Sequence, residues 1–192
     1  MEYHLKTPLN IEDIEPLRIG DIVYLSGKVL TARDEAHKRI LETPLKDMPF
    51  FLERGAIYHC GPLMKKDDSG LWEVVAAGPT TSARMSAMTP EFLELHNVRV
   101  LIGKGGMDKI AGSFRGKCVY LAYTGGCAAL AADSIKNVHA VHWLDLGMPE
   151  AVWELEMDEF GPLIVGIDIK GNDLFNNIRE NVKENLNEIS RP

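Results

Sequence analysis

Three short apolar runs in this sequence each end in a glycine-containing turn that is followed by helix-forming residues. The runs are residues 71–77, 98–102 and 118–122, and they carry the β-branched and aromatic residues typical of strands. In an open α/β sheet, the turns that follow neighbouring strands converge on one crevice. We therefore expect an α/β fold whose functional residues lie on these turns.

The first of these turns has the sequence Gly-Pro-Thr-Thr-Ser-Ala-Arg-Met at residues 78–85. Thr80, Thr81 and Ser82 are candidate N-caps of a helix that begins here. The free N–H groups and the positive end of such a helix would attract an anion. Arg84 lies four residues after Thr80, so both could share one face, and a guanidinium fork fits a carboxylate. The simpler alternative is a capping threonine in a connection that binds no ligand.

Two further cations lie at predicted structural transitions. Arg33 stands at the start of a predicted helix, and His37 lies one turn inside it. Lys104 lies among three glycines in Gly-Lys-Gly-Gly-Met at residues 103–107, which lets the backbone approach a ligand and direct an ammonium group at it. The spacing of a phosphate-binding loop is absent. The simpler interpretations are a solvated Arg33, a half-buried His37 and a surface lysine in a tight turn.

Hydrophobic periodicity and turn residues divide the rest of the chain. We expect strands at residues 21–27, 56–60, 71–77, 98–102, 118–122, 138–143, 152–157 and 162–169. We expect helices at 11–17, after a cap at Thr31 or Asp34, at 82–88, from 89, from 127 and at 174–192, with a hairpin turn at 65–70. Because the sequence has no repeat and no low-complexity linker, we predict a single domain over residues 1–192.

The charge balance restricts the classes of partner. The formal net charge is −7, from 21 basic and 28 acidic residues, with no basic run, so nucleic acid is a poor partner. The sequence lacks an apolar run of the roughly 20 residues that span a membrane, and its N-terminus lacks the pattern of a secretory signal. We therefore expect a cytoplasmic protein with no membrane partner, whose cations gather where an anion binds.

The cysteines and histidines do not form a metal-binding pattern. Cys60, Cys118 and Cys127 are far apart and make no CxxC pair, which is typical of reduced cytosolic thiols. Cys127 at a helix start is either a reactive thiol or a small buried one. His139 and His142 are three residues apart in a predicted strand, which would place them on opposite faces. We expect no metal ligand in this chain.

Four strings in this order resemble the C-terminal portion of the class I iron–sulfur hydro-lyases. They are Thr-Ala-Arg-Asp-Glu-Ala-His at 31–37, the string at 78–85, the string at 103–107, and Phe-Gly-Pro-Leu-Ile-Val at 160–165. The resemblance covers nearly the whole chain, and the length is similar to that of the separate β subunit of two-subunit fumarases and of L-tartrate dehydratase. The strings at 78–85 and 103–107 are specific in combination, whereas either alone would be weak.

The resemblance implies a fold, a partner and a cofactor. The fold is a swivelling β/β/α domain with a mixed sheet and flanking helices. A four-iron four-sulfur cluster is held by cysteines of a partner α subunit and not by this chain. The implied activity is the reversible hydration of fumarate to L-malate by a hetero-oligomer, and the β subunit is active only with its α subunit.

The resemblance also implies the residues on the substrate side. We expect the substrate-binding residues to be Arg33, Thr81, Arg84, Lys104 and Gly105. Dehydration of malate removes a proton next to a carboxylate, so a dianionic substrate gains further negative charge. Cations placed on the carboxylates would stabilise that charge where water is excluded.

The proton carrier stays open at this point. Thr80 matches the threonine that the family proposes as base, but an alcohol is a poor base near neutral pH without help from a neighbour. Asp34 or His37 could carry the proton instead. The catalytic candidates are therefore Thr80, Asp34 and His37.

Two other functions remain as alternatives. The β subunit of L-tartrate dehydratase differs by a single substrate hydroxyl, which one hydrogen-bond partner can select. A non-catalytic dicarboxylate-binding module would keep the anion-binding turns without needing a cluster-bearing partner. A zinc hydrolase is opposed by the cysteine and histidine spacing.

Overall fold

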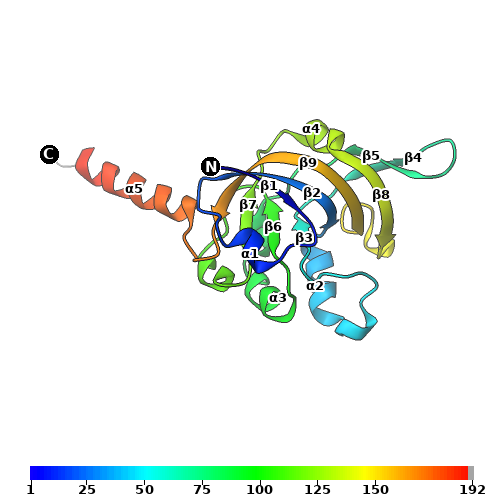
Figure 1. Ribbon diagram of the computed structural model, residues 1–192, viewed down its shortest axis with the longest axis horizontal. Coiled ribbons are helices and arrows are strands. Elements are labelled where there is room, and N and C mark those ends of the chain that lie inside the picture. Colours follow the sequence, from blue (N-terminus) through cyan, green and yellow to red (C-terminus); the bar gives the residue numbers. More distant parts are fainter. Residues whose placement is uncertain (190–192) are drawn as a thin grey trace.

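The computed structural model describes residues 1–189 and shows a mixed α/β fold (Figure 1). The strands are β1 (Glu2–Lys6), β2 (Ile22–Thr31), β3 (Ala56–Tyr58), β4 (Leu63–Lys66), β5 (Trp72–Ala76), β6 (Val100–Gly103), β7 (Val119–Ala122), β8 (Ile135–His142) and β9 (Val152–Ile167). The helices are α1 (Ile11–Ile14), α2 (Asp34–Glu42), α3 (Thr89–Leu95), α4 (Ala128–Asp133) and α5 (Leu174–Ile189), with short 3₁₀ helices η1 (Leu45–Asp47), η2 (Ser82–Met85), η3 (Ala111–Phe114) and η4 (Leu144–Leu146). The expected α/β class with a mixed sheet and flanking helices is confirmed.

The main sheet has seven strands in the order β1-β2-β3-β6-β7-β9-β8. Neighbouring strands from β1 to β7 are parallel, whereas β9 runs antiparallel to β7 and to β8. An additional antiparallel pairing joins β2 to β9, so the circuit β2-β3-β6-β7-β9 closes into a barrel-like sheet. In Figure 1, β9 curves over the top of this barrel beside β2.

Strand β9 differs from the two separate strands predicted at 152–157 and 162–169. It continues through residues 158–161, which lie beside β2 with register shifts along that pairing. The glycine at position 161 is required here, because a Cβ would lie 2.8 Å from the carbonyl oxygen of Val23 and 2.8 Å from the Tyr24 ring. Glycine and proline signal a turn locally, but pairing with β2 keeps the chain extended.

Apolar side chains form two cores on opposite faces of the sheet. Along β6, Val100 and Ile102 belong to one core and Leu101 to the other, as the alternation of a strand requires. The second core also contains Ile40 of α2 and Phe92 of α3. Burial of these side chains therefore fixes α2 and α3 against one face of the barrel.

Several local predictions are confirmed. The strands at 56–60, 71–77, 98–102 and 118–122 match β3, β5, β6 and β7 within a few residues, and the hairpin turn at 65–70 joins β4 to β5. Helix α3 begins at Thr89, with proline in its first turn. The helix predicted after a cap at Thr31 or Asp34 is α2, but its N-cap residue is Arg33. The capping prediction is therefore wrong, whereas the helix itself is correct.

Helix α5 extends away from the barrel in Figure 1 and exposes apolar side chains along its length. The exposed side chains are Ile178, Val182, Leu186 and Ile189. The prediction of a helix at 174–192 is confirmed up to Ile189, and residues 190–192 lie outside the described residues. Within residues 1–189, none of the helices combines the length and the apolar character needed to cross a membrane.

Candidate active site

Four parallel strands end at the same edge of the barrel. In the register of the sheet, Thr31 of β2 lies beside Tyr58 of β3, Tyr58 beside Ile102 of β6, and Ile102 beside Leu121 of β7. The turns that follow these strands therefore meet at one edge, as predicted for the strands at 98–102 and 118–122. The predicted strand at 71–77 is β5, which belongs to the separate two-stranded sheet with β4 and is not a neighbour of these strands. This edge is formed by residues 33–37, 59–61, 80–84, 103–106 and 123–126, and we call its exposed surface the rim.

Residues 80–82 connect two of the turns that the sequence singled out. The Thr80 N–H donates to the carbonyl oxygen of His59 at 2.7 Å. The Lys104 N–H then donates to the Thr80 carbonyl at 3.1 Å, and the Ser82 N–H donates to the Lys104 carbonyl at 3.0 Å. The segment therefore lies as an extended strand between the ends of β3 and β6, and it places Thr81 and Lys104 side by side with exposed side chains.

This arrangement corrects the helix predicted at 82–88. Only the four residues of η2 are helical, as a 3₁₀ turn, and the Thr81 side chain makes no capping hydrogen bond. The N–H groups of Thr80 and Ser82 already bond to backbone carbonyls. The turn is therefore too short to supply the helix N-terminus on which the predicted anion site depends, and that part of the prediction is wrong.

Arg84 makes a bidentate ion pair with Asp34 across the rim. Its Nε donates to Asp34 Oδ1 at 3.1 Å, and its Nη2 donates to Asp34 Oδ2 at 2.5 Å. Asp34 is the first residue of α2, so the pair joins η2 to the start of that helix. The pair uses one edge of the guanidinium, and the edge formed by Nη1 and the second Nη2 hydrogen is directed elsewhere. The side chain of Arg84 is 48% exposed, so this second edge is available to a carboxylate.

Arg33 lies next to the Arg84–Asp34 pair and is mostly buried. Its Nη2 is 3.2 Å from Glu150 Oε1. Its side chain also passes close to Gly61, where a Cβ would lie 2.5 Å from Arg33 Nη1. The Glu150 carboxylate therefore neutralises part of the charge of Arg33 and fixes its direction.

Lys104 is exposed on the turn after β6. A Cβ at position 125 would lie 2.9 Å from Lys104 Cδ, so the lysine stem passes over Gly125 on the turn after β7. Among the described residues, no carboxylate lies within ion-pair distance of the Lys104 ammonium group. Gly105 follows with φ +73, in the left-handed region that favours glycine. The rim therefore offers an ammonium group without an internal partner.

His37 is fully buried under the rim. Its Nδ1 lies 2.9 Å from the carbonyl oxygen of Arg33, which can only accept, so Nδ1 carries the proton. Burial is the main cause that lowers the pKa of His37 to about 4, so the ring is neutral near pH 7. The buried His37 ring therefore supports the backbone at Arg33 through this hydrogen bond.

Three buried residues that were not among the predicted site residues form a hydrogen-bonded chain below the rim. His59 Nδ1 is 2.8 Å from Ser82 Oγ, and the Tyr120 hydroxyl is 3.0 Å from Ser82 Oγ and 2.7 Å from the Gly105 carbonyl oxygen. All three side chains have no exposed surface. The position of His59 directly after β3 was the available sequence signal, but the partners come from distant segments.

The cysteines do not form a set of metal ligands. Cys60 and Cys118 are buried in different cores, and burial raises the pKa of both thiols. Among residues 1–189, no group of three or more His, Cys, Asp and Glu side chains is arranged to hold a metal ion. These thiols therefore do not fit an iron–sulfur cluster.

His139 and His142 correct a prediction about faces of the sheet. Each Nε2 lies 2.9 Å from a glutamate oxygen, of Glu156 for His139 and of Glu154 for His142. The two glutamates are two residues apart on β9, so both histidines lie on one face. An irregularity between Val138 and Ala140 adds a residue to β8 and reverses the expected alternation.

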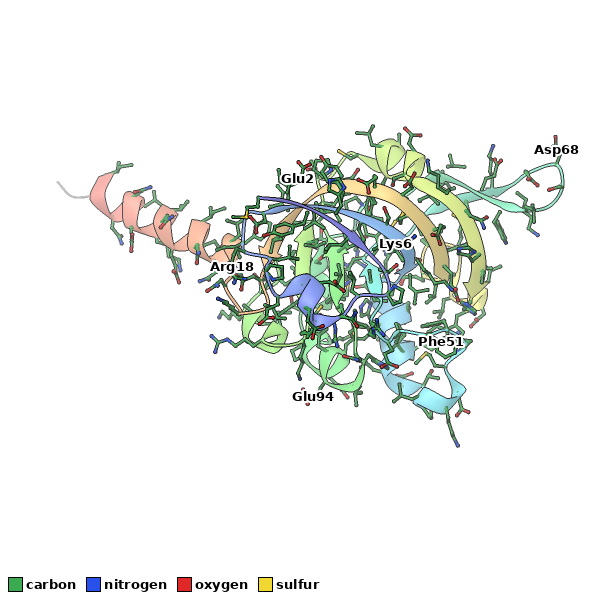
Figure 2. All side chains as sticks on the ribbon, in the orientation of Figure 1. Glu2, Lys6, Arg18, Phe51, Asp68 and Glu94 are labelled. Atoms are coloured by element: carbon green, nitrogen blue, oxygen red, sulfur yellow. The ribbon has the colours of Figure 1, made fainter. Side chains whose placement is uncertain are left out.

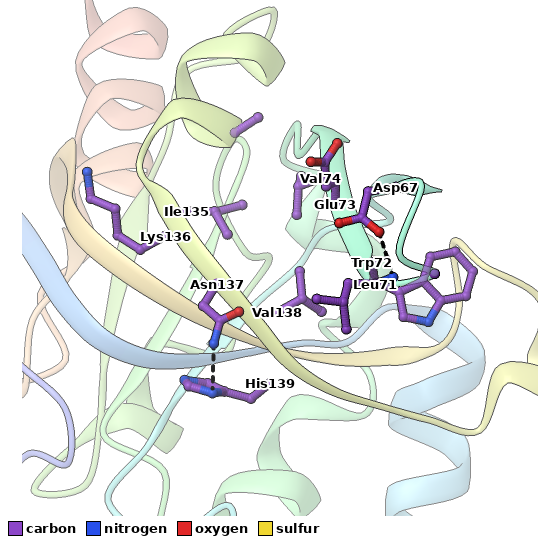
Figure 3. A pocket seen from close by; sticks show the side chains of 12 residues that line it. Asp67, Leu71, Trp72, Glu73, Val74, Ile135, Lys136, Asn137, Val138 and His139 are labelled. Atoms are coloured by element: carbon purple, nitrogen blue, oxygen red, sulfur yellow. Dashed lines mark hydrogen bonds between the residues drawn. The ribbon is translucent and has the colours of Figure 1, made fainter.

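A cleft lies elsewhere, between the β4–β5 hairpin and β8. It has a volume of about 530 Å³, and residues such as Trp72, Glu73, Asn137 and His139 line it (Figure 3). It contains none of the predicted site residues. Size alone therefore favours this cleft, but the arrangement of cations favours the rim, and we assign the candidate site to the rim.

The barrel-like fold and its cationic rim define an α/β protein suited to binding a small anionic substrate. A family model described as "Fumarase C-terminus" matches residues 1–178. The chain belongs to this family, and the resemblance seen in the sequence is confirmed.

Named relatives agree with this assignment. The chain is 50% identical over 194 residues to a Methanocaldococcus jannaschii protein named "Putative L(+)-tartrate dehydratase subunit beta", with 98% of each chain covered. It is 42% identical over 185 residues to "L(+)-tartrate dehydratase subunit beta" of Escherichia coli, covering 95% of this chain and 90% of that protein. It is 38% identical over 190 residues to "Putative fumarate hydratase class I" of Geobacillus stearothermophilus, covering 98% of this chain but 36% of that protein.

Proposed function

We propose that this chain is the β subunit of a two-subunit hydro-lyase that interconverts fumarate and L-malate. The observation that carries the proposal is the rim, where Arg33, Arg84 and Lys104 come from three distant segments to one edge of the barrel. The names of the relatives, which are dehydratase and hydratase subunits, support a hydro-lyase. A dicarboxylate supplies the two anionic groups that such a rim can bind.

L(+)-tartrate is the second candidate substrate. The relatives of similar length to this chain are named as tartrate dehydratase β subunits. Tartrate has one more hydroxyl than malate, and a single buried hydrogen-bond partner is able to select for it. The same cations would bind the carboxylates of either acid.

The lengths of the relatives support a partner subunit. The relative named as a fumarate hydratase has most of its length outside the part that this chain covers. The relatives that this chain matches almost end to end are named as β subunits. We propose that a separate cytoplasmic α subunit corresponds to the rest of the fumarate hydratase relative, and that this α subunit and the present chain form a hetero-oligomer.

We also propose that the α subunit ligates the four-iron four-sulfur cluster that membership of this family implies. Among the described residues, the thiols of this chain are not gathered into a group of three or more possible metal ligands, so they do not fit such a cluster. We therefore derive no step through the cluster, and the chemistry assigned to this chain is binding and proton handling at the rim.

On the substrate side, we propose that Arg84 binds one carboxylate through its outer edge while Asp34 holds the inner edge. Lys104 would neutralise negative charge that develops on the substrate when the proton next to the carboxylate leaves. Thr81 and Gly105 border this position on the exposed surface. Arg33, held by Glu150, would contribute longer-range positive potential.

For the proton carrier, we propose Thr80 with support from its surroundings. Asp34 is engaged by Arg84, and His37 is buried, neutral and bonded to the Arg33 backbone. Thr80 lies on the rim itself, where its backbone is fixed by His59 and Lys104. A threonine base needs a neighbouring group to accept or stabilise its proton, and the partner subunit faces this edge in our proposal.

The experiment is anaerobic reconstitution of this chain with its α subunit and iron, followed by assays on malate, fumarate and L(+)-tartrate. We expect turnover of at least one substrate pair by the complex and none by the single chain. If the complex carries an intact cluster and turns over none of them, the enzyme proposal fails and the non-catalytic dicarboxylate-binding module is favoured. Dehydration by the single chain would contradict the two-subunit arrangement.

A further inference from the structure

We infer that His59, Ser82 and Tyr120 form a directional hydrogen-bond chain whose role is to position Lys104 for the substrate. The inference rests on the proposed function and deepens it, because it assigns three positioning residues to the same site. None of the three side chains reaches the surface, so none of them contacts substrate.

The direction of the chain follows from the number of protons available. The Gly105 carbonyl can only accept, so the single hydroxyl proton of Tyr120 is donated to it at 2.7 Å. The Tyr120 oxygen then accepts the hydroxyl proton of Ser82 at 3.0 Å. Ser82 Oγ in turn accepts from His59, whose Nδ1 at 2.8 Å must carry the proton. Every donor in this arrangement has one acceptor.

This direction fixes the state of His59. With the proton on Nδ1, the buried Nε2 carries a lone pair and has no partner among the described residues. A missing partner is less costly for a lone pair than for a buried N–H or a charge. Burial, followed by repulsion from His37, lowers the pKa of His59, so the ring is neutral. The neutral Nδ1–H form is the one that the chain requires.

The hydrogen-bond chain ends at the carbonyl groups of Lys104 and Gly105, which determine the direction of the Lys104 side chain. The Ser82 N–H bonds to the carbonyl of Lys104, and the Tyr120 hydroxyl bonds to the carbonyl of Gly105. The Lys104 N–H is held by Thr80. The backbone on both sides of the exposed ammonium group is therefore tied to buried residues. This fixes a cation for which the described part of the chain offers no ion pair.

Gly103 shows how closely the hydrogen-bonded side chains of Ser82 and His59 are packed below Lys104. A Cβ at this position would lie 1.9 Å from Ser82 Oγ and 3.1 Å from His59 Nδ1. The strand β6 therefore needs glycine as its last residue so that Ser82 can reach both neighbours. The first glycine of Gly-Lys-Gly-Gly is therefore required by the buried hydrogen bonds of Ser82, and not only by the approach of a ligand.

The test is a double-mutant cycle in the assembled enzyme between Tyr120→Phe and Lys104→Met. We expect Tyr120→Phe to lower kcat/KM for the turned-over acid about tenfold in the wild-type background. In the Lys104→Met background, the same change should lower kcat/KM less than about twofold, because its effect passes through Lys104. Ser82→Ala should show the same dependence and provides a second variant if Tyr120→Phe does not fold.

The matched control is Thr7→Val, which also removes a buried hydroxyl that donates to a backbone carbonyl, that of Lys28 at 2.8 Å. We expect it to leave kcat/KM unchanged in both backgrounds. Equal losses from Tyr120→Phe in the two backgrounds, or no loss in the wild type, would overturn the inference.

A readout without activity separates this inference from the proposed function. Nitrogen-15 NMR of the single chain should show His59 as the neutral form protonated on Nδ1, and Ser82→Ala should shift its Nδ1 resonance. His59 protonated on Nε2 would overturn the hydrogen-bond chain even in an active enzyme. A complex that is inactive on all three acids, with His59 in the expected form, would overturn the proposed function and the role of the chain in positioning a substrate cation.

Discussion

The Arg84→Lys variant of the assembled enzyme is expected to lose about 100-fold in kcat/KM while its two subunits still associate. The guanidinium of Arg84 has two edges, and Asp34 occupies one of them. Lysine keeps the charge but has only a point-like ammonium group, so it cannot hold Asp34 and a substrate carboxylate as two planar pairs. Loss of a charged hydrogen bond costs about 1.5–3 kcal/mol, which corresponds to this range of effect.

The matched control is Arg39→Lys. Arg39 lies on α2 and also forms an ion pair with an aspartate, Asp145 of η4. We expect this variant to keep wild-type kinetics. Steady-state rates and analytical size-exclusion chromatography of both variants provide the comparison. Wild-type rates for Arg84→Lys, with the complex intact, would refute the assignment of Arg84 as a substrate-binding residue.

The Lys104→Met variant of the assembled enzyme is expected to lower kcat more than Arg84→Lys does. Methionine has a similar length and keeps the apolar stem over Gly125, but it removes the one ammonium group on the rim that has no internal partner among the described residues. If Lys104 stabilises charge that develops during proton removal, the loss appears in kcat as well as in kcat/KM. We expect a decrease in kcat on the order of 100-fold, similar to removal of one donor at a developing anion.

Lys65→Met is the control for this change, because Lys65 is an exposed lysine on the β4–β5 hairpin that pairs with Glu73. Its kinetics should equal those of the wild type. An increase in KM alone for Lys104→Met would show that Lys104 binds the ground state and the transition state equally and gives no stabilisation specific to the transition state. Unchanged kinetics would remove Lys104 from the site.

Much of the fold follows from local sequence signals. The strand at 118–122 is a continuous apolar run, and the strand at 98–102 is apolar except for Arg99, as expected for strands with core on both faces. Closure of the barrel was not predictable in this way. It depends on pairing between β2 and β9, which are more than 100 residues apart in the chain, and this pairing also keeps residues 158–161 extended. Figure 2 shows the side chains of the described residues on the ribbon.

The candidate site was predictable only in part. The glycine turns and their cations could be read from short strings, because each string carries its own turn chemistry. The ion pair of Arg84 with Asp34 joins segments 50 residues apart, so no local pattern indicates it. The helix predicted at 82–88 is wrong for the same reason, because the residues before it bond to His59 and Lys104, which directly follow β3 and β6.

In our proposal, Arg84 and Lys104 bind one small dicarboxylate at the rim, and Arg33 adds positive potential there. The most direct test is a crystal structure of the assembled enzyme with the acid that it turns over. We expect one carboxylate on the outer edge of Arg84 and the Lys104 ammonium group within hydrogen-bond distance of the same ligand. A bound acid that contacts only the α subunit, with Arg84 and Lys104 directed to separate surfaces, would contradict the claim.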